Sequence, residues 1–298
     1  MQLSLFSVSY AGLWGQASLD LHSFIAKARN LGFDSVMLAG KRPHASPLDM
    51  DRPHRDRLRR ALEENQVQCA AIAGYTDLIS PGAAEVPLRE MQIAYVDSLA
   101  RLARNLDASV VRIFTTYEQP GQNPHGVWNV VVRTIQEMCD RSAEYGVKLA
   151  IQNHHDVAVD TDALLELLHD INRPNCRVGF DAWSPALRGE DLFAAAKRMA
   201  PHTAMTTNAD YIRFPRHRYV PELVNYQREE PDLVRAVPFG EGFIDYPAFF
   251  RGLKEGGFEG IASYEICSPI RGGGSEQNLD SCARRYLDWM RSQVPEQS

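Results

Sequence analysis

Polar and ionisable side chains follow several apolar segments of this chain, at the points where those segments end. They include two carboxylates, Asp181 and Glu265, and a histidine pair, His154 and His155, that comes shortly after Gln152. Carboxylates and imidazoles exchange protons in enzymes, and carboxylate or amide oxygens ligate divalent cations. A hydrophobic strand has no structural need to finish in Asp or Glu, although strands also simply end where solvent begins. The pattern therefore predicts an acid–base or metal-assisted reaction.

A second group of residues has side chains that bind hydroxyl or acidic groups. Lys41 and His44 form a basic cluster, which fits either ligand binding or a solvated surface. Arg271 precedes three glycines, where the backbone can approach a ligand closely or simply be flexible. Arg112 within a buried strand also fits a structural ion pair, and Trp183 also fits ordinary packing. The expected substrate contacts are Lys41, His44, Arg112, His155, Trp183, Asn208 and Arg271.

The apolar segments that precede these residues recur along the whole chain. Most of them are continuous rather than alternating, which is typical of parallel strands buried on both faces. Amphipathic segments with helical spacing lie between them, for example 87–106 and 160–171. The eight predicted strands are 3–9, 35–39, 68–73, 109–114, 148–153, 177–181, 203–208 and 260–266.

Eight strands that alternate with helices form either a closed (β/α)8 barrel or an open doubly wound sheet. The count of eight favours the barrel, and so does the absence of a GxGxxG turn after the first strand. We therefore predict an α/β fold, a single (β/α)8 TIM-barrel domain over residues 1–298. Barrels place catalytic side chains at the C-terminal ends of their strands, which is where the residues above stand. The long segment at about 209–242 is expected to be an irregular loop, acting as a lid, a partner contact or a solvated connection.

The composition excludes several classes of protein. The chain has 298 residues, of which 23% are charged and 44% hydrophobic, as in ordinary globular proteins. Its net charge of −6 argues against a nucleic-acid partner and against an anionic membrane surface. No apolar stretch is long enough to span a membrane, and the N-terminal residues do not resemble a signal peptide. The five cysteines have no CxxC spacing, so we expect a reduced, cytoplasmic protein without disulfides.

The last part of the sequence resembles a known family. Residues 240–254, GEGFIDYPAFFRGLK, lead into residues 257–265, GFEGIASYE. This is similar to the pattern that ends the barrel of the xylose isomerase-like superfamily: G-E-G, a helix, G-Y-x-G, and a strand that finishes in Glu. The superfamily includes sugar isomerases, ketose 3-epimerases, inositol-catabolism enzymes and DNA-repair endonucleases. The order and spacing of the strands extend the resemblance over nearly the whole chain.

The resemblance implies a divalent metal held by Glu, Asp, His and Glu at the ends of strands five to eight. Asp181 and Glu265 match two of these ligands, whereas Gln152 replaces the first Glu and Thr207 replaces the His. Glutamine ligates through its carbonyl oxygen and brings no charge, and oxygen ligands favour Mn²⁺ or Mg²⁺ over Co²⁺ or Zn²⁺. His154 is a candidate replacement ligand. The expected metal ligands are therefore Gln152, Asp181, Glu265 and His154.

The resemblance also implies a reaction class. In the epimerases, two metal-bound glutamates on opposite sides of a keto sugar move a proton. Gln152 has no titratable proton, so Glu265 or His154 is the expected catalytic base. The leading hypothesis is a sugar isomerase or epimerase that abstracts a proton next to a carbonyl with the help of a metal. One alternative is a β-eliminating lyase on 3-keto-glycosides, similar to the barrel subunits of C-glycoside-cleaving enzymes. Another alternative is a sugar-binding descendant without catalysis.

The expected partner is a small carbohydrate, with neither nucleic acid nor a membrane involved. Enzymes of the C-glycoside-cleaving type combine a barrel subunit with a small second chain. The long segment at about 209–242 is the part of this sequence that could contact such a subunit. A homo-oligomer is the other expected assembly.

Overall fold

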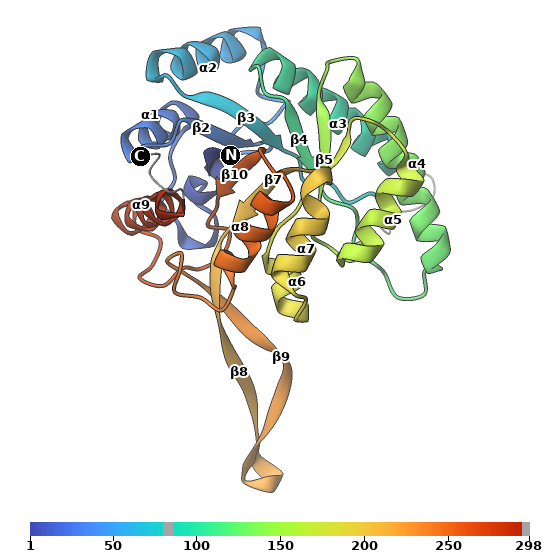
Figure 1. The fold of residues 1–298 in the computed structure, drawn as a ribbon, viewed down its shortest axis with the longest axis vertical. Coiled ribbons are helices and arrows are strands. Elements are labelled where there is room, and N and C mark those ends of the chain that lie inside the picture. Colours follow the sequence, from blue (N-terminus) through green and yellow to red (C-terminus); the bar gives the residue numbers. More distant parts are fainter. Residues whose placement is uncertain (80–85, 294–298) are drawn as a thin grey trace.

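The structure, a computed structural model, is a closed barrel of eight parallel strands surrounded by helices (Figure 1). It describes residues 1–79 and 86–293. The order around the barrel is β1-β10-β7-β6-β5-β4-β3-β2, and pairing of β1 with β10 closes it. This confirms the predicted (β/α)8 TIM barrel. The barrel strands are β1 (Gln2–Phe6), β2 (Ser35–Ala39), β3 (Gln68–Ala73), β4 (Val110–Ile113), β5 (Lys148–Gln152), β6 (Cys176–Gly179), β7 (Thr203–Asn208) and β10 (Ile261–Tyr264).

Helices cover the outside of the barrel, and several begin at a side chain that caps them. The Asp160 side chain accepts a hydrogen bond from the backbone N–H of Ala163 at 2.9 Å, which satisfies a donor that the helix leaves free. None of the described helices is long and apolar enough to cross a membrane. The helices are α1 (Leu21–Leu31), α2 (Arg52–Asn65), α3 (Leu88–Asn105), α4 (Pro124–Ala143), α5 (Thr161–Ile171), α6 (Trp183–Arg188), α7 (Leu192–Met199), α8 (Tyr246–Glu255) and α9 (Glu276–Ser292).

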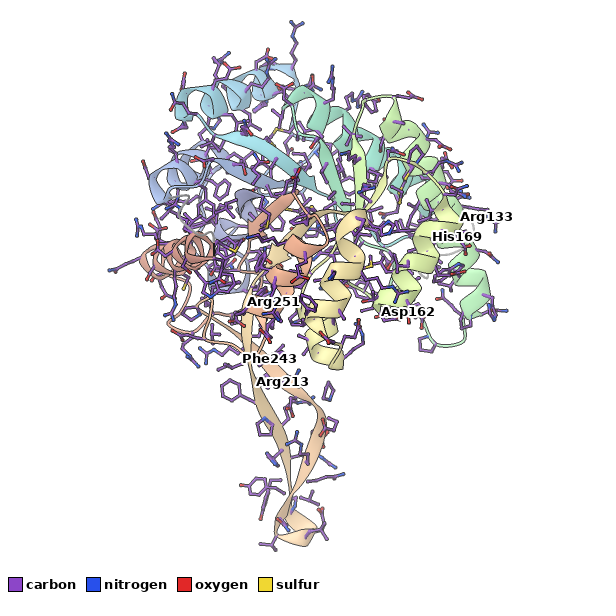
Figure 2. All side chains as sticks on the ribbon, viewed as in Figure 1. Arg133, Asp162, His169, Arg213, Phe243 and Arg251 are labelled. Atoms are coloured by element: carbon purple, nitrogen blue, oxygen red, sulfur yellow. The ribbon has the colours of Figure 1, made fainter. Side chains whose placement is uncertain are left out.

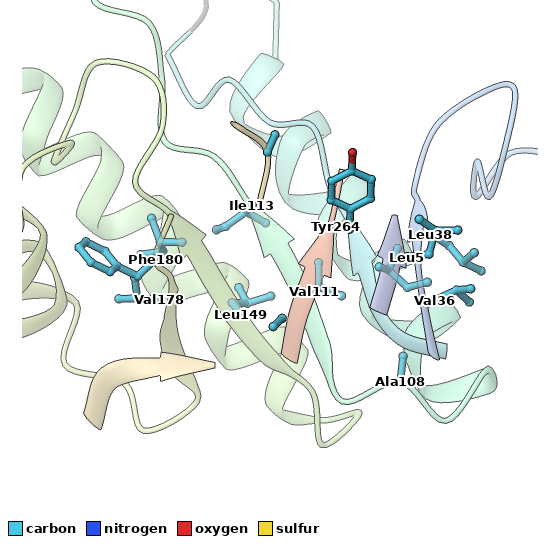
Figure 3. Close-up of a cluster of buried hydrophobic side chains, with 14 of the residues drawn as sticks. Leu5, Val36, Leu38, Ala108, Val111, Ile113, Leu149, Val178, Phe180 and Tyr264 are labelled. Carbon is cyan, nitrogen blue, oxygen red and sulfur yellow. The ribbon is translucent and has the colours of Figure 1, made fainter. Parts of the chain in front are cut away.

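Side chains of the barrel strands alternate between two hydrophobic clusters, as the two-residue period of a strand requires. One cluster lies between the strands and the helices, and Figure 3 shows part of it. Its members include Val36, Leu38, Val111, Ile113, Leu149, Val178, Phe180 and Tyr264. The other cluster fills the barrel interior and includes Met37, Ala39, Val110, Ala150 and Met205.

The same alternation determines which polar side chains point into the barrel. Arg112 stands two residues after the inward Val110, and Gln152 stands two residues after the inward Ala150. Glu265 directly follows Tyr264, which points outward. The C-terminal ends of the strands therefore aim a layer of polar side chains at the barrel axis.

The segment at about 209–242 is a long hairpin rather than an irregular loop. Strands β8 (Asp210–Val220) and β9 (Asn225–Val237) pair in antiparallel fashion and project away from the barrel as an arm (Figure 1). Most of its residues are exposed on both faces, so the sequence lacks the alternation that marks a half-buried strand. At the base of the arm, the guanidinium of Arg213 lies 4.0 Å from the centre of the Phe243 ring (Figure 2).

Candidate active site

A cavity of about 450 Å³ opens at the C-terminal ends of the barrel strands. A larger depression of about 600 Å³ lies at the opposite end, where Gln2 and Gln68 begin their strands. Barrel enzymes carry their chemistry at the C-terminal end, so the first cavity is the candidate active site. Six of the predicted site residues line it: Lys41, Arg112, Gln152, His154, His155 and Glu265.

Asp181 lies next to this cavity, in a hydrogen-bond network across the ends of β5, β6 and β7. Thr207 donates its backbone N–H to Asp181 Oδ1 at 2.7 Å and its hydroxyl to Oδ2 at 2.6 Å. Gln152 Nε2 also donates to Oδ2. Burial raises the pKa of Asp181, but these donors favour the ionised carboxylate and oppose the rise. Both carboxylate oxygens of Asp181 thus already accept hydrogen bonds from neighbouring residues.

Glu265 is one of the two carboxyl groups that line the cavity, and Asp77 is the other. Burial raises its pKa above the ordinary range, and the negative charge of Asp181 raises it further, whereas Arg112 acts in the opposite direction. The thiol of Cys267 makes a weak hydrogen bond to Oε1 at 3.5 Å. A carboxyl group whose pKa is raised toward neutrality can both take up and release a proton, as a general acid–base must.

These residues do not fit the divalent metal that the resemblance implies. A cation beside Asp181 would meet the hydroxyl of Thr207 and the amide N–H of Gln152, which are donors aimed at the same carboxylate. The remaining oxygen of Gln152, Oε1, is buried without a hydrogen-bond partner among the described residues, but with the Glu265 carboxylate it would give a cation only two ligands. Within residues 1–79 and 86–293, no group of three or more His, Cys, Asp or Glu is arranged to hold a metal ion.

The two histidines line the cavity as neutral rings. His154 Nδ1 accepts a hydrogen bond from the backbone N–H of His155 at 2.7 Å, so the ring proton is on Nε2, which is a donor. Burial and the positive charge of Arg112 lower the pKa of His154 to about 4. Burial also lowers the pKa of His155 to about 4, and His154 and Arg112 contribute to the shift. The geometry thus gives His154 the role of a hydrogen-bond donor rather than a base or a metal ligand.

Two cations line the opposite part of the cavity. Arg112 is only 2% exposed, and it donates from Nη1 to the carbonyl oxygen of Gly74 at 2.9 Å. Its guanidinium carbon lies 4.0 Å from the centre of the Phe114 ring. The Lys41 ammonium lies 3.7 Å from the centre of the Tyr75 ring, and burial and Arg112 lower its pKa. Neither cation forms an ion pair in the described part of the chain, so the expected structural ion pair of Arg112 is absent there.

Two expected substrate contacts, His44 and Asn208, pack inside the protein instead of lining the cavity. His44 is 2% exposed, because the turn after β2 directs its ring inward. Its Nε2 lies 3.1 Å from the carbonyl oxygen of Leu19, and its ring stacks on Phe24. Asn208 is fully buried and donates to the carbonyl oxygen of Ser263, which joins β7 to β10. Neither residue lines the cavity.

Two further expected contacts also lie outside the cavity lining. Arg271 forms an ion pair with Glu241 at 2.9 Å on the protein surface. Trp183 begins α6, and its ring stacks on His154 with the ring centres 5.3 Å apart. Trp183 therefore packs behind the cavity, against His154 and against Tyr211, whose ring centre lies 6.1 Å from its own.

Several cavity residues were absent from the sequence-based prediction. Tyr75, Asp77 and Cys267 closely follow barrel strands, so their position after a strand could have indicated them. Trp14 comes from the segment after β1, and Gln92 comes from α3. For these two, no local pattern in the sequence marks a place in the cavity.

The family is shown by comparison with known proteins. Residues 25–293 match the family described as xylose isomerase-like TIM barrel, and the chain belongs to this family. A curated relative is the rhizopine catabolism protein MocC of Rhizobium meliloti, 26% identical over 137 residues. That match covers 45% of this chain and 41% of the relative, so less than half of each protein is compared.

Solved structures share the fold over almost the whole chain. AsbF of Bacillus anthracis, a probable 3-DHS dehydratase involved in petrobactin synthesis, has a TM-score of 0.75 and 18% identity, with 99% of this chain and 100% of that chain covered. D-psicose 3-epimerase of Clostridium cellulolyticum H10, solved with D-tagatose, has a TM-score of 0.75 and 15% identity, with 98% and 99% covered. At these identities the similarity is one of fold.

Proposed function

We propose that this protein is an enzyme that acts on a keto sugar or a related polyhydroxy carbonyl compound. In this proposal Glu265 transfers a proton at the carbon atom next to the carbonyl group. The observation that carries it is the position of Glu265, a partly buried acid that lines a cavity of about 450 Å³ opposite a buried guanidinium. Family members such as the D-psicose 3-epimerase act on sugars, which supports the substrate class.

The proton transfer uses groups of this chain alone. The Glu265 carboxylate takes the proton from carbon, and the electron pair of that C–H bond moves toward the carbonyl oxygen to form an enediolate. His154 Nε2–H donates a hydrogen bond to this oxygen, as a neutral imidazole does when its other nitrogen is occupied. The hydroxyl proton on the deprotonated carbon then moves to the former carbonyl oxygen, and Glu265 returns its own proton to the former carbonyl carbon, which completes an isomerisation.

We assign proton transfer to one carboxyl group, Glu265, because Asp77, the other carboxyl group that lines the cavity, already accepts a hydrogen bond from Thr116. Epimerisation at one carbon needs a proton donor and a proton acceptor on opposite faces of the substrate. Gln152 cannot titrate, and both oxygens of Asp181 already accept hydrogen bonds. We therefore favour reactions in which one group acts on one face, such as an aldose–ketose isomerisation.

This single acid–base group also supports a second candidate, the β-elimination of a substituent from a keto sugar or 3-keto-glycoside. Glu265 would remove the proton next to the carbonyl and then return it to the departing oxygen, leaving an unsaturated ketone. The probable 3-DHS dehydratase AsbF has the same fold and eliminates water, as its name states.

Product analysis tests the proposal and separates its two forms. The protein is incubated with D-fructose, D-fructose 6-phosphate, 2-keto-D-gluconate, 3-keto-glucose and a 3-keto-glycoside, and products are followed by NMR. A new aldose indicates isomerisation, and a new vinyl proton indicates elimination. Glu265→Gln should lower the rate by about 100-fold or more. Glu241→Gln, which changes a carboxylate outside the cavity, should leave the rate unchanged. No product from any substrate would indicate a sugar-binding protein instead.

A further inference from the structure

We propose that the cavity binds an acidic group of its ligand between Lys41 and Arg112, so that the substrate carries a carboxylate or a phosphate. The name cation side is used here for Lys41, Tyr75 and Arg112. The inference rests on the proposed function for the carbonyl part of the substrate, whereas the anion site itself rests on the contacts described next.

The cation side is built by three adjacent strands. Lys41 follows β2, Tyr75 follows β3, and Arg112 belongs to β4. The ammonium of Lys41 lies 3.7 Å from the centre of the Tyr75 ring, and the guanidinium carbon of Arg112 lies 4.9 Å from the same centre. Two positive groups thus share one aromatic ring and line one cavity. Two like charges held this close repel each other unless an anion lies between them.

The cation side also contains polar atoms that lack partners. Among the described residues, neither Arg112 Nε nor the hydroxyl of Tyr75 has a hydrogen-bond partner, although both atoms are buried. Arg112 is only 2% exposed, so bulk solvent does not reach its guanidinium freely. Buried polar groups without partners are rare because they cost free energy. A ligand that accepts hydrogen bonds from these donors would remove that cost.

The acidic side chains of the cavity do not supply this acceptor. Asp77 and Glu265 are the carboxyl groups that line it, and neither forms an ion pair with Lys41 or Arg112 in the described ranges. Asp77 instead accepts a hydrogen bond from the hydroxyl of Thr116 at 2.6 Å. Glu265 follows β10, which lies across the barrel from β4. The positive charge of the cation side is therefore available to a ligand.

The arrangement also orients the substrate. A guanidinium offers a planar pair of donors and an ammonium offers a mobile point charge, and both bind carboxylates and phosphates. With its acidic group on the β2–β4 side, the substrate extends across the cavity toward Glu265. The acidic group then selects which carbon atom meets the acid–base residue. Neutral sugars lack this anchor.

Binding measurements test this without requiring turnover. D-fructose, 2-keto-D-gluconate and D-fructose 6-phosphate are titrated against the Glu265→Gln variant by calorimetry, and inorganic phosphate and acetate serve as minimal probes. We expect one of the two acidic sugars to bind about tenfold or more tightly than D-fructose. Tighter binding of 2-keto-D-gluconate identifies a carboxylate ligand, and tighter binding of D-fructose 6-phosphate identifies a phosphate. The preference should weaken at high salt.

Lys41→Gln should abolish the preference, because it removes one of the two charges from a side chain that is not fully buried. Arg42→Gln is the matched control, since Arg42 is the neighbouring cation and pairs with Asp49 on the surface. Circular dichroism checks that both variants fold. The inference would be overturned if all three sugars bound with equal affinity, or if none of them bound. It would also be overturned if Lys41→Gln and Arg42→Gln changed the preference for acidic sugars equally. Turnover of D-fructose by the wild type without any preference for acids would overturn the anion site alone and leave the proposed function intact.

Discussion

Thr207 donates both its backbone N–H and its hydroxyl to the two carboxylate oxygens of Asp181, at 2.7 and 2.6 Å. Where the family resemblance implies a metal-binding histidine, this chain places a side chain that completes the hydrogen bonding of the neighbouring aspartate. These hydrogen bonds favour the ionised form of Asp181 against the effect of burial, and its negative charge helps to raise the pKa of Glu265. In the proposed function, the departure at residue 207 replaces metal ligation by the tuning of one acid–base group.

The Asp181 network should be a substantial source of stability. Asp181→Asn replaces an acceptor by an amide, so that two of the donors around residue 181 lose their partner. We expect a loss of about 1–3 kcal/mol in the free energy of unfolding, measured by urea titration. Asp140→Asn is the control, because Asp140 forms an exposed ion pair with Arg173 and exposed pairs contribute little. If Asp181→Asn were as stable as this control, the hydrogen bonds to Asp181 would not contribute to stability as proposed.

Metal content should depend on residues 152 and 207. Protein purified without chelator, then dialysed against Mn²⁺, should hold no stoichiometric divalent metal by elemental analysis. The double variant Gln152→Glu, Thr207→His removes the donors aimed at Asp181 and supplies two ligands in their place. We expect this variant to gain about one Mn²⁺ per chain. Stoichiometric metal in the wild type would show that the site tolerates a cation despite these donors.

The stability of the protein should fall in mild acid partly because of His44. Burial lowers the pKa of His44 in the folded state, whereas in the unfolded chain it is close to 6.5. The unfolded state therefore binds more protons below about pH 6.5, and stability falls as the pH decreases toward the folded-state pKa.

His44→Gln removes this contribution, so its stability should decrease less than that of the wild type between about pH 7 and pH 5. Urea unfolding at a series of pH values gives the comparison. His217→Gln, on the exposed arm, should parallel the wild type. If the free energy of unfolding decreased equally with pH in the wild type and in His44→Gln, His44 would not be a cause of the decrease.

The arm formed by β8 and β9 should contact a second copy of the chain. Leu223 and Val224 at its tip are 72% and 81% exposed, and Tyr226 and Leu233 are also exposed. A two-stranded hairpin is only marginally stable in isolation, and exposed apolar groups gathered on one element mark contact surfaces. Two arms related by a twofold axis can bury these groups against each other.

We expect light scattering after gel filtration to give the mass of a dimer. A variant with Leu223→Ser and Val224→Ser should be monomeric and keep the barrel's circular dichroism. A monomeric wild type would rule out this use of the arm.

The sequence predicted the barrel well because buried parallel strands are continuous apolar segments. It also indicated Arg112, Gln152 and Glu265, since strand periodicity directs alternate side chains into the barrel. It was less informative after the strands end. His44 turns into the protein beside Leu19, and Arg271 pairs with Glu241, because loop geometry depends on contacts that no local pattern encodes.

The arm could not be recognised for a related reason. Its strands are exposed on both faces, so nothing in their hydrophobic pattern distinguishes them from an irregular segment. The chemistry of the site was also incomplete in the sequence. The replacements at Gln152 and Thr207 were visible, but the direction of their hydrogen bonds toward Asp181 required the structure.

The central claim is that Glu265 moves a proton next to a carbonyl group without a metal. Solvent deuterium incorporation tests it most directly. Wild type and Glu265→Gln are incubated in D₂O containing EDTA with keto sugars and their acidic derivatives, and deuterium at the carbon next to the carbonyl is measured by NMR. We expect incorporation by the wild type, unchanged by EDTA and lost in Glu265→Gln. Incorporation that stops with EDTA, or that persists in Glu265→Gln, would contradict it.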